Sequence, residues 1–171
     1  MSTIEPVTQL DARYSDAGVT ATDWADATRH LETAELFWVT TVRGDGRPHT
    51  TPTIAVWHDG ALCFSTGPEE QKARNLARHP RCSLLTGTNT LHEGLDIVVE
   101  GEAVRVTDDA RLRQLADRWE AKYGAEWHFD VADGAFQHGN GSAYVFAVAP
   151  DTAYGFSKDP YRHTRWRFDR S

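Results

Sequence analysis

The stretch ELFWVTTVRGDGRPHTTPTIAVWHDGALCFST, residues 35–66, decides the fold. Its first segment, residues 35–43, is rich in β-branched and aromatic residues, which favours a strand. Gly44-Asp45-Gly46 predicts a tight turn, because glycine tolerates a positive φ angle. A second strand is expected over residues 47–57, and Asp59-Gly60 turns it into a third, residues 61–66. The stretch therefore predicts a meander of three antiparallel strands joined by hairpins.

The flanking sequence adds further strands and three helices. Apolar residues at helical spacing predict helices over residues 22–34, over 69–79, and from Asp108 or Asp109 to Gly124. Strands are expected over residues 81–87, over 95–107 with a bulge at Gly101, and over 142–149. Residues 125–141 look irregular. Residues 1–20 are expected to form a frayed N-terminal arm before one domain, residues 21–171.

The number of strands indicates how the sheet is arranged. A sheet of about six antiparallel strands has two exposed edges if it stays open, and closing it into a barrel removes them. The sequence therefore predicts an α+β fold that is mainly β: an antiparallel six-stranded β-barrel with inserted helices.

Composition excludes several functional classes. The chain has 171 residues, of which 40% are hydrophobic, so it can form one core. Its net charge of −7 and its scattered basic residues argue against a nucleic-acid partner. The sequence contains neither an apolar run long enough for a membrane span nor a secretory signal, so a cytoplasmic protein is expected. Cys63 and Cys82 are expected to be small buried hydrophobes in a reducing compartment.

The common catalytic signatures are absent from the sequence. It contains no G-x-S-x-G elbow, no H-E-x-x-H, no P-loop and no G-x-G-x-x-G fingerprint. The eight histidines are dispersed, so we expect no metal site. No catalytic side chain can be assigned from these patterns.

One group of residues could bind an anion. Ser65 and Thr66 end a predicted strand, and Lys72 follows six residues after Thr66 in the first turn of a predicted helix. Hydroxyls, free helix N-terminal amides and an ammonium can together hold a phosphate. The alternative is a capped surface helix whose Lys72 faces water. Glu69 and Glu70 suit the helix dipole but would repel a nearby phosphate.

Several motifs occur together in a specific order: TTVRGDGRPH (40–49), WHDGALCFST (57–66), QKARNL (71–76), HPR (79–81) and TRWRF (164–168). On these motifs the chain resembles the pyridoxamine 5′-phosphate oxidase-like, or flavin/deazaflavin oxidoreductase, superfamily of FMN-binding split barrels. The resemblance implies a split β-barrel homodimer with two cofactor sites at the interface. In the FMN-dependent oxidases an arginine precedes the lysine, whereas Gln71 stands here. The chain looks closer to members that use the deazaflavin coenzyme F-420.

The resemblance also implies site residues. Ser65 and Thr66 would lie near the cofactor phosphate, and Lys72 would bind it. Thr51, Thr53 and Ala55, on the strand before, would line the ring with backbone as much as with side chains. Arg74 and Arg78 either bind the acidic tail of the deazaflavin or form a solvated basic face. Trp166 either covers the ring or packs on the end of the barrel. The implied cofactor-binding residues are Thr51, Thr53, Ala55, Ser65, Thr66, Gln71, Lys72, Arg74, Asn75, Arg78 and Trp166.

Three functions remain open at this point. The first is an oxidoreductase that transfers a hydride between coenzyme F-420 and a small unsaturated or quinone-like molecule. The second is the same fold using FMN or FAD. The third is a non-catalytic protein that binds a flavin, deazaflavin or tetrapyrrole. A proton donor could be Tyr144, His49, Trp166 or water, because the cofactor itself carries the hydride chemistry.

Overall fold

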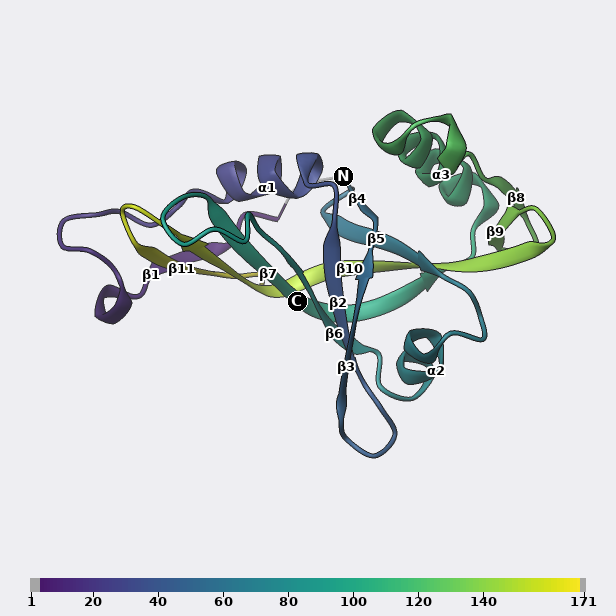
Figure 1. Cartoon of the computed structure of the whole chain (residues 1–171), viewed down its shortest axis with the longest axis horizontal. Coiled ribbons are helices and arrows are strands. Elements are labelled where there is room, and N and C mark those ends of the chain that lie inside the picture. Colours follow the sequence, from purple (N-terminus) through teal and green to yellow (C-terminus); the bar gives the residue numbers. More distant parts are fainter. Residues whose placement is uncertain (1–3, 170–171) are drawn as a thin grey trace.

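The computed structural model describes residues 4–169. In this part of the chain antiparallel strands predominate, accompanied by three α-helices (Figure 1). The helices are α1 (Trp24–Thr33), α2 (Gln71–Arg78) and α3 (Asp109–Tyr123), with 3₁₀ turns at Ala12–Tyr14 and Ala125–Trp127. The strands are β1 (Val7–Leu10), β2 (Phe37–Val42), β3 (Pro48–Thr53), β4 (Ala55–His58), β5 (Ala61–Thr66), β6 (Arg81–Thr86), β7 (Leu95–Val106), β8 (Asp130–Ala132), β9 (Ala135–His138), β10 (Gly141–Ser157) and β11 (Arg162–Arg167).

The strands form one curved antiparallel sheet. Its main path runs β1-β11-β10-β7-β6-β2-β3, β5 pairs with both β10 and β4, and β9 joins β8 to β10. This arrangement confirms the predicted α+β split barrel. The three predicted helices are confirmed too, and Asp108 caps α3 by accepting a hydrogen bond from the Arg111 N–H at 2.8 Å.

The expected strand over residues 47–57 is in fact two strands. β3 pairs with β2, whereas β4 pairs with β5, and the ladder breaks at Ile54 between them. The predicted three-strand meander is therefore wrong, because two separate hairpins replace it. The break is fixed from α3: the Lys122 ammonium donates to the Ala55 carbonyl at 2.8 Å, and the Tyr123 hydroxyl accepts from the Ala55 N–H at 3.1 Å.

The bulge lies on β10 and not at Gly101. The register of β10 against β7 shifts between Pro150 and Thr152, opposite Gly101 and Glu100. Gly101 has a different role, because a Cβ there would lie 2.4 Å from the carbonyl oxygen of Ala149. The strand expected over residues 142–149 also continues to Ser157.

Residues 125–141 are more regular than predicted. They contain the β8–β9 hairpin, whose turn residues Asp133 and Gly134 both have positive φ angles of 55° and 66°. An Asp-Gly pair with this conformation forms a two-residue turn that matches the twist of a hairpin. The prediction that this segment is irregular is therefore wrong.

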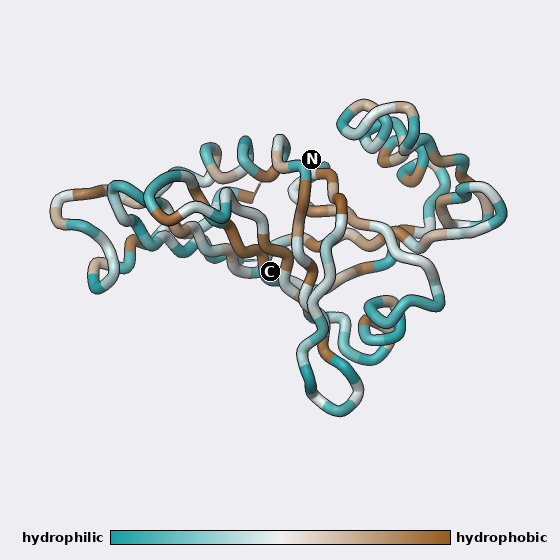
Figure 2. The backbone as a smooth tube through the Cα atoms, viewed as in Figure 1, coloured by the Kyte–Doolittle hydropathy of each residue, from teal (hydrophilic) through white to brown (hydrophobic). Residues whose placement is uncertain are grey.

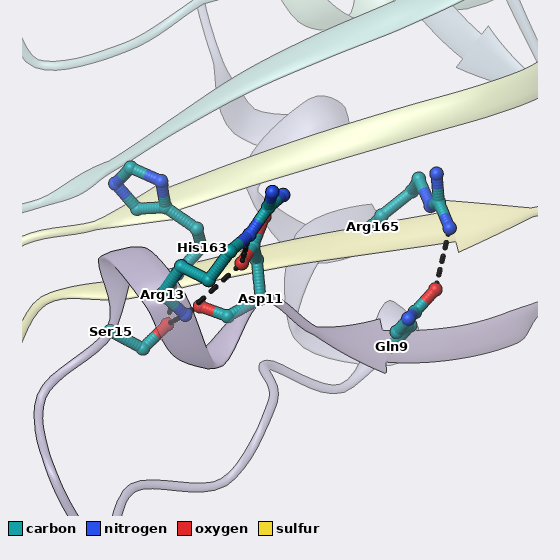
Figure 3. A network of polar contacts seen from close by, with 6 residues as sticks. All are labelled: Gln9, Asp11, Arg13, Ser15, His163 and Arg165. Atoms are coloured by element: carbon teal, nitrogen blue, oxygen red, sulfur yellow. Dashed lines mark hydrogen bonds and ion pairs between the residues drawn. The ribbon is translucent and has the colours of Figure 1, made fainter.

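The N-terminal segment is not frayed over residues 7–10. β1 pairs with β11 in the register Val7↔Arg167 to Leu10↔Thr164. Arg165 donates to the Gln9 side chain at 2.6 Å, and the His163 N–H donates to Ser15 Oγ at 3.0 Å (Figure 3). These contacts attach residues 7–15 to the last strand of the sheet.

Two apolar clusters hold the fold together. The larger fills the barrel and includes Leu31 of α1, Phe37, Phe64, Ile97 and Trp166. The smaller packs α3 against the other face of β5 and β10, around Trp119 and Phe136. Figure 2 shows hydrophobic residues gathered in the central strands, whereas the β2–β3 loop is hydrophilic. None of the helices in residues 4–169 is long and apolar enough to cross a membrane.

Both cysteines lie in these clusters as free thiols. Burial raises the pKa of Cys63 and of Cys82 to about 12. This confirms that they behave as small buried hydrophobes, because the reactive thiolate is strongly disfavoured.

Candidate functional site

The candidate site begins where β5 ends and α2 starts. Glu70 occupies the N-cap position of α2, and its Oε1 accepts a hydrogen bond from the Gly67 N–H at 2.8 Å. Its Oε2 accepts from the ammonium of Lys72. Lys72 is 8% exposed, so the alternative in which it faces water is wrong. The start of α2 therefore holds a carboxylate between a backbone amide and a buried ammonium.

The Glu70 carboxyl group is ionised in this position. Burial alone would raise its pKa, but the hydrogen bonds from Lys72 and from the Gly67 amide outweigh burial and lower the pKa. A hydrogen bond to the charged form of an acid favours that form. The same donors can therefore stabilise an oxyanion.

A chain of side-chain hydrogen bonds ties α2 to the sheet. Gln71 Nε2 donates to Asn75 Oδ1 at 2.7 Å, and Asn75 Nδ2 donates to Thr41 Oγ1 at 2.9 Å. Thr41 Oγ1 in turn donates to the His49 carbonyl at 3.4 Å. Because Asn75 and Thr41 are buried, this chain fixes α2 against β2 and β3.

The inner face of β3 carries unsatisfied polar atoms. His49, Thr51 and Thr53 alternate with exposed residues and lie opposite the inward-facing residues of β2. His49 Nδ1 and Thr51 Oγ1 are buried without a hydrogen-bond partner among residues 4–169. Burial, with the charges of Arg43 and Lys72, lowers the pKa of His49, which favours the neutral imidazole. Such orphaned atoms are rare in native structures, and each one calls for a partner or a functional role.

Ser65 and Thr66 do not lie together. They face opposite sides of β5, because Thr66 pairs with Tyr144 and Ser65 with Val145 of the smaller cluster. Thr66 is buried, and its hydroxyl donates to the Gly67 carbonyl at 3.3 Å. Thr66 therefore lies beside the start of α2, whereas Ser65 faces the side of α3.

The backbone of Ala55 is already occupied by hydrogen bonds, unlike the backbone role predicted for it. Both its N–H and its carbonyl oxygen are bound to side chains of α3. Its backbone is therefore not free to contact a ring. Thr53, next to the break, uses its hydroxyl to donate to the Ile54 carbonyl at 3.2 Å.

The remaining predicted residues lie at a distance or on the surface. Arg74 is exposed and pairs with Glu69 at 2.8 Å, and exposed Arg78 lies against the β2–β3 loop at Gly44. Trp166 is fully buried, contacts Trp24 and donates to the Thr22 carbonyl at 3.1 Å. The structure thus favours the packing alternative for Trp166.

Two residues of this region are not among those predicted from the sequence. Thr41 was not proposed, although the alternation of β2 places it inward with Phe37 and Val39. Arg105 was also missed: its guanidinium lies 3.5 Å from the centre of the Tyr144 ring. Nothing local in the sequence could indicate that contact, because β7 and β10 bring the two residues together. No cluster of three or more metal-ligating side chains occurs in the described chain.

Solved structures with the same fold have varied descriptions. A haem-binding protein from Mycobacterium smegmatis has a TM-score of 0.66 at 16% identity, covering 85% of this chain and 59% of that one. The haem storage protein from Vibrio cholerae has a TM-score of 0.57 at 16% identity, covering 74% and 88%. An F420 reductase has a TM-score of 0.50 at 22% identity, covering 73% and 93%. At these identities the likeness shows the fold alone.

The sequence itself matches one protein family. No match was found among curated proteins. The match over residues 25–157, which include β2 to β10 and α2, is to the family described as pyridoxamine 5′-phosphate oxidase. The chain belongs to the pyridoxamine 5′-phosphate oxidase family.

Proposed function

We propose that this protein is an oxidoreductase that binds the phosphate of a flavin-type cofactor, coenzyme F-420 or FMN, at the start of α2. The observation that supports this most is the Glu70 carboxylate, which accepts from the Gly67 amide and the Lys72 ammonium. These donors suit a phosphate oxygen as well as a carboxylate oxygen. A cofactor phosphate would replace Glu70 there.

The inner face of β3 fits the remainder of such a cofactor. His49 Nδ1 and Thr51 Oγ1 are buried polar atoms that lack a protein partner within residues 4–169. A flavin or deazaflavin ring carries carbonyl and N–H groups that can satisfy both. Asn75 and Thr41 would keep α2 at a fixed position relative to this strand. When bound, the cofactor would supply hydride transfer to or from a small unsaturated or quinone-like molecule.

The choice between the two cofactors rests on Gln71, Arg74 and Arg78. Gln71 uses its amide to hold Asn75 and brings no positive charge to the phosphate. Arg74 and Arg78 lie one turn apart on the exposed face of α2, where an acidic oligoglutamate tail could pair with them. These features favour coenzyme F-420, with FMN as the alternative.

Absorbance and mass spectrometry of the purified protein test this proposal. We expect a bound compound whose absorbance and mass identify a deazaflavin or flavin. If the purified protein contains no cofactor, titration with FMN and with coenzyme F-420 should show saturable binding to at least one. Failure to bind either compound would contradict the proposal.

A second candidate is a tetrapyrrole-binding protein. Two structures with this fold are described as haem-binding and haem-storage proteins. In this chain, His49 presents a buried neutral imidazole nitrogen without a partner among the described residues, and neutral imidazole is a common metal ligand. The same purification distinguishes the two, because an intense haem absorbance band that His49→Ala removes would support this candidate instead.

We also propose that two copies of the chain form a homodimer through the outer face of the sheet. Strand register aligns Pro52, Trp38, Leu85, Val98 and Tyr154 in one row across five strands. Trp38 is 45% exposed and Leu85 is 40% exposed, although both are large and apolar. The row reaches β3, which pairs only with β2 within residues 4–169. A second copy on this face would cover the row and the open edge beside the candidate site.

A further inference from the structure

A groove lies at the other end of the sheet from α2. It is bounded by α1, the start of β7 and the turn between β10 and β11, and its volume is about 480 Å³. Figure 1 shows α1 above the left part of the sheet and α2 below its right part. β7 runs from this groove towards the region of α2. Leu95 lines the groove, and Val106, eleven residues on, pairs with Val145, which also pairs with Ser65 near the end of β5. At the rise of a strand, eleven residues span about 36 Å along β7.

Two buried polar atoms in the lining of this groove lack partners. Thr22 is 8% exposed, and its Oγ1 has no hydrogen-bond partner among the described residues. Its backbone is fully used, because the N–H donates to Thr164 Oγ1 at 3.0 Å and the carbonyl accepts from Trp166. Arg162 Nε is also buried without a partner in residues 4–169. Leaving a buried donor unpaired is costly, and more so for a charged group.

The charges in the groove select the ligand. Its lining contains the cations Arg29, Lys158 and Arg162 and one carboxylate, Asp26, in a chain whose net charge is −7. Arg29 pairs with Asp26, and Lys158 pairs with Asp96 at 2.8 Å just outside the lining. Arg162 also lines the groove, and its buried Nε lacks a hydrogen-bond partner among residues 4–169. What this site lacks is a negatively charged hydrogen-bond acceptor.

We infer that this groove binds a small ligand carrying a phosphate or carboxylate group, with an oxygen that accepts from Thr22 Oγ1 and Arg162 Nε. A guanidinium and a hydroxyl together form charge-assisted hydrogen bonds to such an oxyanion. The volume of the groove leaves room for more of the ligand than the oxyanion itself. The site is separate from α2 and does not depend on the proposed function.

Amide NMR titration of the full chain tests this inference, with inorganic phosphate and citrate as separate probes. We expect saturable shifts at Thr22 and Arg162 with at least one probe. Thr22→Val and Arg162→Gln should each weaken binding by about tenfold, because each removes a hydrogen bond to a charged group. Arg167→Gln is the matched control, since it removes the same charge from the opposite face of β11 and should leave the affinity unchanged.

The possible results of this titration either support the site or overturn it. Binding of phosphate alone or of citrate alone supports the site and identifies the ligand class. Thr22→Val should not lower the unfolding temperature, because its hydroxyl has no partner to lose in the described structure. The absence of shifts at these amides with both probes would overturn the inference. Equal weakening by Arg167→Gln would also overturn it, because binding would then depend only on net charge.

Discussion

The Lys72 ammonium is bound by the carboxylate of Glu70, two residues earlier in the chain, and both lie at the N-terminus of α2. Glu70 therefore acts as an internal oxyanion in a place suited to a phosphate. A ligand that binds there must compete with this carboxylate. Removing the charge of Glu70 and removing the charge of Lys72 should therefore change the cofactor affinity in opposite directions, which tests the site directly.

The exposed arginines of α2 give a prediction about cofactor choice. Replacing Arg74 and Arg78 together by Gln should weaken the binding of coenzyme F-420 on the order of fivefold, since exposed ion pairs contribute up to about 1 kcal/mol each. FMN has no acidic tail, so its affinity should barely change. Added salt should reduce the difference. Fluorescence titration of both cofactors checks this, and an equal loss for both would exclude a role in tail binding.

The outer face of the sheet gives a prediction about assembly. Trp38→Glu places a charge between Pro52 and Leu85 in the apolar row and should convert the dimer to a monomer, as measured by sedimentation. Val104→Glu is the matched control, because Val104 is 58% exposed on β7 and lies outside the row. A monomeric wild-type protein, or an unchanged mass for Trp38→Glu, would contradict the dimer.

Lys122 gives a prediction about pH. Burial lowers its pKa from 10.5 to about 8 in the folded protein. Between these two values the unfolded chain binds more protons than the folded chain, so the contribution of Lys122 to the free energy of unfolding rises with pH across this window. We expect Lys122→Met to remove this rise.

Denaturant unfolding of both proteins between pH 8 and 10.5 measures the effect of Lys122. Tyr123, whose pKa is raised mainly by burial, is present in both proteins and cancels in the difference. If the two stability curves run parallel through the window, the environment of Lys122 is not as the structure describes it.

Local patterns predicted most of the elements but not the contacts that join them. The three helices and most strands followed from apolar spacing and turn residues, and the Asp133-Gly134 turn could also have been recognised from its residue types. The break at Ile54 could not. It depends on Lys122 and Tyr123, nearly seventy residues later, which bind the backbone of Ala55.

The candidate site was predicted only in part, because local patterns do not show which distant residues come into contact. Thr66, Gln71, Lys72 and Asn75 were proposed from their order, and the structure brings them close to the start of α2. The burial of Lys72 was not foreseen, because a lysine in a first helical turn is usually solvated. The packing of α2 on β2 through Asn75 and Thr41 buries it, and that contact joins residues 34 positions apart.

Paired substitutions at Lys72 and Glu70 test the central claim most directly, with the dissociation constant of the cofactor as the measured quantity. Lys72→Met keeps the buried aliphatic stem and should weaken binding about tenfold to a hundredfold, because it removes a hydrogen bond to a charged group. Glu70→Gln removes the competing charge and should strengthen binding several-fold. Circular dichroism of both variants controls for folding. Opposite changes in affinity are the result that this account predicts, and unchanged affinity in both variants, or a loss of affinity in both, would contradict it.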